Sequence, residues 1–147
     1  MLLGCSVICF PTKADIVVSQ LLDFGIIVIA DNSAPASLAI DEFNIVTADP
    51  SFIIISPGQP AIYQITGLTP NTTFTVDVDI LNVSMNPGVP STEVFDLEIV
   101  RAGTTVLSDS VGEATLTFGG RITSSGSNGL NFADTTFTSN IRITVNN

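Results

Sequence analysis

Apolar and polar residues alternate along much of this chain, most clearly between Ala61 and Ile80. In the second half of that stretch the apolar side chains share one parity and polar side chains take the other; the apolar set is Phe74, Val76, Val78 and Ile80. Successive side chains of a strand point to opposite faces, so the pattern predicts one buried and one solvated face. In the first half, Tyr63 and Ile65 share a face. The turn-like composition of Gly67–Asn71 between the halves predicts a β-hairpin.

Further short strand-like segments follow, separated by turn residues at intervals of roughly ten positions. Gly25–Ala30 is almost entirely apolar and predicts a fully buried strand, and Phe52–Ile55 is a second continuous apolar strand. A Gly119–Gly120 pair inside a strand predicts a bulge or bend. Because no window has the apolar spacing of a helix, the pattern predicts an all-β fold, an antiparallel β-sandwich of about nine or ten short strands.

The N-terminus has a different pattern. Met1–Phe10 is a short apolar run, followed by Pro11 and, before the polar Asp15, the small residue Ala14. This order is typical of a secretory signal peptide, here residues 1–14 with cleavage after Ala14, and the run is too short to span a membrane. Signal peptides usually begin with a basic segment, which is missing here, so a protein start upstream of Met1 stays an open alternative. The remaining residues, 15–147, are expected to form a single β-sandwich domain.

A second interpretation of the N-terminus is a lipoprotein signal. The run Leu2-Leu3-Gly4-Cys5 resembles a lipobox, in which Cys5 would carry the lipid. Both interpretations predict export to the periplasm, the cell surface or the medium. Neither predicts a membrane-inserted protein after the signal is removed.

Charge and residue usage narrow the function classes. The chain has four Lys and Arg against fourteen Asp and Glu, a net charge of −10, which argues against nucleic acid and anionic membranes as partners. It has no His, and its two cysteines, Cys5 and Cys9, lie in the predicted signal peptide. Catalytic triads, Cys–His pairs and His or Cys zinc sites therefore have no candidates in the predicted mature domain. The sequence predicts a non-enzymatic protein without cofactor or metal.

Two pairs of acidic residues are candidates for a calcium site. Asp77 and Asp79 share one strand face, and Asp96 and Glu98 share another. If the two strands were neighbours, four carboxylates could attract Ca²⁺. Strand positions two apart are too straight for a usual calcium loop, so a solvated acidic face is the favoured interpretation.

Five segments resemble, in their order and spacing, a small secreted bacterial family catalogued as domain of unknown function 4402. They are Leu22–Gly25, Ser56–Gly67, Asn71–Val76, Gly112–Gly120 and Phe137–Asn146. Members are similar to fimbrial pilin subunits, so the resemblance implies export, an Ig-like β-sandwich and a surface or filament role, without catalytic residues. Unlike chaperone–usher pilins, the predicted mature chain has no disulfide, and it ends without their penultimate aromatic residue.

Pilin-like subunits would assemble by strand addition, in which an extended segment of one subunit completes the sheet of the next. The candidate donor follows the predicted cleavage site directly, with alternating apolar residues Ile16, Val18, Leu22 and Phe24. The expected partners are copies of the chain or other surface subunits. The alternative is that this segment is the first strand of a complete monomer.

The second candidate function is a carbohydrate-binding module. Such a module needs exposed aromatic side chains on one face, and Tyr63 is the obvious candidate. The nine Phe residues fall mainly on inward parities, so packing in the core is the favoured interpretation for the aromatic residues.

Overall fold

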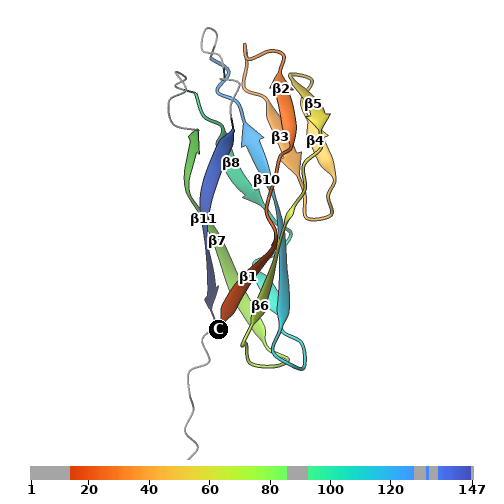
Figure 1. Cartoon of the computed structure of the whole chain (residues 1–147), viewed down its shortest axis with the longest axis vertical. Coiled ribbons are helices and arrows are strands. Elements are labelled where there is room, and N and C mark those ends of the chain that lie inside the picture. The colour runs from red at the N-terminus through yellow and green to blue at the C-terminus, as the bar shows by residue number, and fades with distance from the viewer. Residues whose placement is uncertain (1–13, 86–92, 128–131, 133–135, 147) are drawn as a thin grey trace, which may run out of the picture.

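The computed structural model describes residues 14–85, 93–127, 132 and 136–146 (Figure 1). All described regular elements are strands, eleven in number, and all their pairings are antiparallel. Their bounds are β1 Asp15–Gln20, β2 Ile26–Ile29, β3 Ser37–Ile40, β4 Val46–Ala48, β5 Phe52–Ser56, β6 Ala61–Thr66, β7 Thr73–Met85, β8 Asp96–Val100, β9 Thr105–Leu107, β10 Ala114–Thr123 and β11 Phe137–Asn146. The all-β prediction is confirmed, with slightly more strands than expected. No helix in this part of the chain is long and apolar enough to cross a membrane.

The strands form three sheets that pack as a β-sandwich. The largest has the order β1-β6-β10-β3-β4, with β8 also paired to β10; the others are β11-β7-β9 and the two-stranded β2-β5. Strand β10 runs along the long axis of the molecule and connects its two halves (Figure 1). Residues Ala114–Phe118 of β10 pair with β6, whereas Gly119–Thr123 pair with β8 on one edge and, from Gly120 onward, with β3. The Ig-like arrangement of the sandwich stays a prediction.

Each half of the molecule has its own hydrophobic core. The lower core lies between β6 and β10 on one side and β7 and β9 on the other, and its buried residues are Ala61, Tyr63, Ile65, Leu68, Phe74, Val76, Val106, Ala114, Leu116 and Phe118. The upper core is built from Ala36, Leu38, Ile40, Phe52, Phe95 and Ile122. In the upper core Phe95 stacks on Phe132 with ring centroids 4.4 Å apart. Both cores fall within the predicted mature domain.

The predicted hairpin over Ala61–Ile80 is wrong in its pairing. The predicted faces are correct, because Tyr63 and Ile65 are buried and Asp77 is exposed. However, β6 pairs with β1 and β10, whereas β7 pairs with β11 and β9, so the two strands lie in different sheets. The Gly67–Asn71 segment crosses between the sheets and inserts buried Leu68 into the lower core. Alternation determines which face is buried, but it does not determine the partner strand.

Gly119 and Gly120 allow neighbouring segments to approach β10 closely, and they do not form the predicted bulge. The pairings of β10 with β6, β3 and β8 show no register shift. A Cβ added at Gly119 would overlap the carbonyl oxygen of Ile40, and one at Gly120 would lie 2.8 Å from Leu22 Cδ2. The absence of side chains at these positions lets the β3 backbone and Leu22 approach the centre of β10.

Two loops share one hydrogen-bonding pattern. In Asp41–Ile45 and again in Asp109–Glu113, the first Asp accepts hydrogen bonds through Oδ1 from the backbone N–H groups two and four residues later, at 2.8–2.9 Å. The fourth residue has a positive φ in both, 65° at Asn44 and 82° at Gly112. A three-residue loop with a left-handed last residue is a common hairpin connection, which Asn and Gly tolerate well.

The Asp109 loop gives a pH-dependent prediction. The backbone N–H of Glu113, with further N–H groups of Val111 and Gly112, lowers the pKa of Asp109 below its ordinary value of 3.8. Folding therefore favours the ionised form, and this contribution is complete above about pH 4 and is lost as the pH falls through the lower folded-state pKa. We expect Asp109→Asn to flatten the loss of unfolding free energy in this acid range, measured by urea denaturation from neutral pH to about pH 2.

Asp96→Asn, at an exposed strand position, is the control for general loss of negative charge. The interpretation is contradicted if Asp109→Asn and Asp96→Asn change the acid profile equally.

Candidate functional site

The predicted donor segment is an edge strand of its own chain. β1 pairs antiparallel with β6, from Asp15 opposite Thr66 to Gln20 opposite Ile62, and among the described strands it has no second neighbour. In the single chain this segment therefore completes the sheet, as the alternative prediction of a complete monomer expects. Its outer edge carries backbone groups that a further strand can pair with.

The four predicted donor side chains occupy different environments. Ile16 and Leu22 pack against the lower core, and Phe24 packs against the upper core. Val18 is 51% exposed, so the prediction that it shares their buried face is wrong. A register shift between Val18 and Gln20 breaks the alternation. The strand also ends at Gln20 rather than Phe24, where the Gln20 side chain donates a hydrogen bond of 2.7 Å to the Pro60 carbonyl.

A second prediction is wrong for the two-stranded sheet of β2 and β5, here called the β2–β5 ribbon. The apolar run Gly25–Ala30 is not buried on both faces, because Ile26 is 62% and Val28 is 47% exposed. Ile53 and Ile55 of the neighbouring β5 are exposed as well. The sequence signal was present in the two unbroken apolar runs, but it could not show that one face lacks a covering layer.

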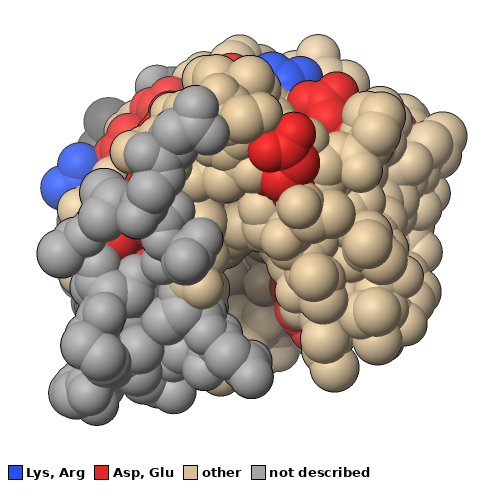
Figure 2. Space-filling model, turned by 90° about the horizontal axis from the view of Figure 1, so that it is seen from above, with Lys and Arg blue, Asp and Glu red and all other residues tan. Residues whose placement is uncertain are grey.

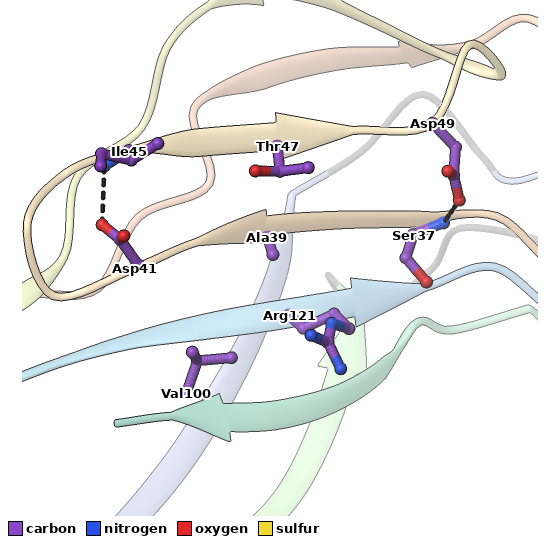
Figure 3. A pocket seen from close by; sticks show the side chains of 8 residues that line it. All are labelled: Ser37, Ala39, Asp41, Ile45, Thr47, Asp49, Val100 and Arg121. Atoms are coloured by element: carbon purple, nitrogen blue, oxygen red, sulfur yellow. Dashed lines mark hydrogen bonds between the residues drawn. The ribbon is translucent and has the colours of Figure 1, made fainter. Parts of the chain in front are cut away.

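A shallow hollow of about 280 Å³ lies on the face of the large sheet where β3, β4, β8 and β10 run side by side (Figure 3). Its lining residues are Ser37, Ala39, Asp41, Ile45, Thr47, Asp49, Val100 and Arg121. They come from widely separated positions in the sequence, so only the fold brings them together. The floor is partly apolar, and hydroxyl, carboxylate and guanidinium groups surround it.

The charged groups at the hollow are held by local bonds. Asp49 Oδ2 accepts a hydrogen bond of 2.7 Å from the Ser37 backbone N–H, and Asp41 caps its own loop (Figure 3). The Nη1 atom of Arg121 lies 3.0 Å from Glu98 Oε2. This arrangement presents fixed donors and acceptors to solvent, which suits a hydroxyl-rich ligand better than a reacting group.

The four acidic residues considered for Ca²⁺ are not brought into one site. Asp77 and Asp79 lie on β7, whereas Asp96 and Glu98 lie on β8, in another sheet. Asp79 is paired with Arg142 at 2.8 Å on the neighbouring β11. Within the described residues no group of three or more potential metal ligands occurs.

Tyr63 is a core residue rather than a sugar platform. It is 6% exposed and stacks on Phe118 with ring centroids 5.7 Å apart. Burial raises the pKa of its hydroxyl. The prediction that aromatic residues pack in the core is confirmed for Tyr63. Among the described aromatic residues, the exposed one is Phe43, at 74%, in the Asp41–Ile45 loop beside the hollow.

The signal-peptide and lipobox predictions fall on residues 1–13, outside the described part of the chain, apart from Ala14. The composition Asn-Pro-Gly-Val-Pro-Ser predicts a loop at residues 86–91, and this segment lies outside the described residues as well.

Comparison with protein-family models gave no match, and neither the curated proteins nor the solved structures contained a significant match to this chain. The resemblance to domain of unknown function 4402 is neither supported nor contradicted by these searches, and it stays a prediction.

Proposed function

We propose that this protein is an exported, non-enzymatic structural or adhesive subunit of a bacterial surface, pilin-like in assembly, in which β1 is exchanged between copies. In the exchanged state, β1 of one copy pairs with β6 of the next. The observation that carries the proposal is the position of β1 at the sheet edge, directly after the predicted cleavage site and with a single partner among the described strands.

The geometry of β1 favours exchange in two ways. Because the donor and the acceptor are identical chains, an exchanged β1 makes the same backbone pairs, so the enthalpic cost is small. The strand is also only partly anchored, since Val17 and Val18 are each about half exposed and a register shift interrupts its pairing. Short, weakly held edge elements are the ones that open locally at low cost.

The test removes residues 15–24 and restores them as a separate peptide. We expect the shortened protein to lose the multimers formed by the longer chain and to bind the added Asp15–Phe24 peptide, because the exposed edge of β6 and the sites of Ile16 and Leu22 are then open. Light scattering measures the mass, and fluorescence of a labelled peptide measures binding.

The matched control is the same peptide with Ile16→Asp and Leu22→Asp, which keeps the backbone but cannot fill the core. If the shortened protein folds and oligomerises like the chain that includes residues 15–24, strand exchange through β1 is wrong.

A carbohydrate-binding module is the second candidate function. Two observations favour it, the polar hollow lined by Asp41 and Ile45 and the exposed Phe43 in the loop between these two residues. Sugars are bound by planar polar groups together with an apolar or aromatic surface. We expect any glycan bound on an array to be lost in Arg121→Ala and in Phe43→Ala. Arg142→Ala, which removes another exposed arginine paired with an Asp, is the control. Binding that survives both substitutions would rule out this face.

A further inference from the structure

The outer face of the β2–β5 ribbon carries exposed aliphatic side chains that form one patch. The exposed fractions are 62% for Ile26, 47% for Val28, 49% for Ile53 and 62% for Ile55. Ile26 and Val28 lie two apart on β2 and share a face, and Val28 lies directly opposite Ile53 in the antiparallel register. Ile55 is the unpaired residue at the register shift of the ribbon, next to Ser56, which lies opposite Ile26. We refer to these four side chains as the ribbon patch. Contiguous exposed apolar surface of this kind marks an interaction site in soluble proteins.

The other face of the ribbon packs on the upper core through Ile27, Ile29 and Phe52. Ile54, opposite Ile27, is the exception on this face, at 37% exposed. Both strands have a single partner among the described strands, each other, so no further layer of described strands covers the patch. The ribbon patch is therefore not needed to close the upper core, and its apolar residues need another physical reason.

The ribbon is also free of charge, although the chain is strongly acidic. No Asp, Glu, Lys or Arg occurs from Phe24 to Ala30 or from Ser51 to Pro60, while the net charge of the chain is −10. Viewed from above in Figure 2, the right-hand side of the molecule, the side on which Figure 1 places β2, β4 and β5, is almost entirely without charged side chains.

We infer that the ribbon patch is an interface between two copies of this chain, packed face to face about a two-fold axis. A two-fold axis near the Val28–Ile53 pair brings each of these residues against the equivalent pair of the partner, so the same patch is complementary to itself. This contact buries uncharged surface on both sides and avoids placing acidic groups against each other.

Other occupants fit the patch less well. A lipid surface is usually bound through basic residues with Trp or Tyr anchors, and the two segments of the ribbon contain none of these. A glycan needs polar partners, which the four aliphatic side chains do not supply. A basic protein partner would find no acidic group within the patch itself.

The proposed dimer is expected to be weak and to become stronger as the salt concentration rises, which distinguishes it from a complex with a basic partner. Stable interfaces bury about 800 Å² on each partner, and four half-exposed side chains supply less than this. Two chains of charge −10 also repel each other, and salt screens this repulsion. Association of two copies should therefore strengthen when NaCl is raised from about 0.05 M to about 0.5 M, whereas binding of a basic partner would weaken.

The test is sedimentation equilibrium of the purified protein, with its N-terminus defined by mass spectrometry, over a wide range of concentration. We expect a monomer–dimer equilibrium that tightens with NaCl. Ile53→Lys and, separately, Ile55→Lys should weaken it at least about tenfold, because each places two cations near the two-fold axis.

Leu107→Lys is the matched control, since Leu107 is an exposed aliphatic residue on β9, 67% exposed, in a different sheet. It should leave the dimer unchanged. Thermal melting checks that all three variants are folded; two independent ribbon variants protect the test against the failure of one.

A protein that stays monomeric at all concentrations and at both salt levels overturns the inference, whether or not it binds phosphatidylcholine vesicles. A dimer that is equally sensitive to Leu107→Lys overturns it as well. This test does not depend on whether β1 is exchanged between copies. Multimers formed through β1 are dissociated by the Asp15–Phe24 peptide and are not limited to two copies.

Discussion

Replacement of Gly119 by alanine is expected to destabilise the protein by about 3 kcal/mol or more and to prevent folding if the protein is only marginally stable. The added methyl group would occupy the position of the Ile40 carbonyl oxygen. Relief requires β3 to move away from β10, yet β3 and β10 are paired from Gly120 to Thr123. Because the obstacle is backbone rather than a flexible side chain, the cost should exceed that of ordinary overpacking in a core.

Gly103→Ala is the matched control, because a Cβ at Gly103 meets no atom within 4 Å. Urea denaturation of both variants measures the difference in unfolding free energy. Equal stabilities for the two variants would contradict the close approach of β3 to β10.

Phe118→Ala is expected to have the second large effect, a loss of about 3–5 kcal/mol. Phe118 is fully buried in the lower core and stacks on Tyr63, so truncation removes the ring contact and leaves a cavity between the sheets. Phe118 also lies on β10 just before the strand changes partners, opposite Ala61 of β6. The loss should therefore weaken the sandwich as a whole rather than one loop.

Phe43→Ala provides the same chemical change at a residue that is 74% exposed, and it should alter stability by less than about 0.5 kcal/mol. Thermal and urea unfolding of the two variants gives the comparison. A small effect at Phe118 together with a large one at Phe43 would contradict the assignment of the lower core.

The buried and exposed faces of individual strands could be predicted from the sequence, because the alternation of apolar and polar residues is a local property. Phe74 and Val76 are buried and Asp77 is exposed, as the pattern predicts. The pairing partners of the strands could not be predicted from the sequence. The chain from β6 to β7 crosses between sheets, and nothing in its turn composition separates this crossing from a hairpin.

The candidate surfaces depended on tertiary structure in a different way. The ribbon patch is hidden in the sequence because a run such as Phe52–Ile55 is apolar on both parities and has the composition of a fully buried strand. The hollow brings together Ser37 of β3, Arg121 of β10 and Asp49, which directly follows β4, and no local pattern connects these residues. In β1, neither the register shift after Val18 nor the exposure of Val18 has a clear signal in the sequence.

The most direct test of the proposed function is the molar mass of the purified protein in solution, by size exclusion with light scattering, accompanied by negative-stain microscopy. We expect filaments or a ladder of multimers that extends beyond two copies and disappears when residues 15–24 are removed or when the free Asp15–Phe24 peptide is present in excess. A single monomeric mass under all conditions, unchanged by removal of that segment, would contradict a surface subunit that assembles through β1.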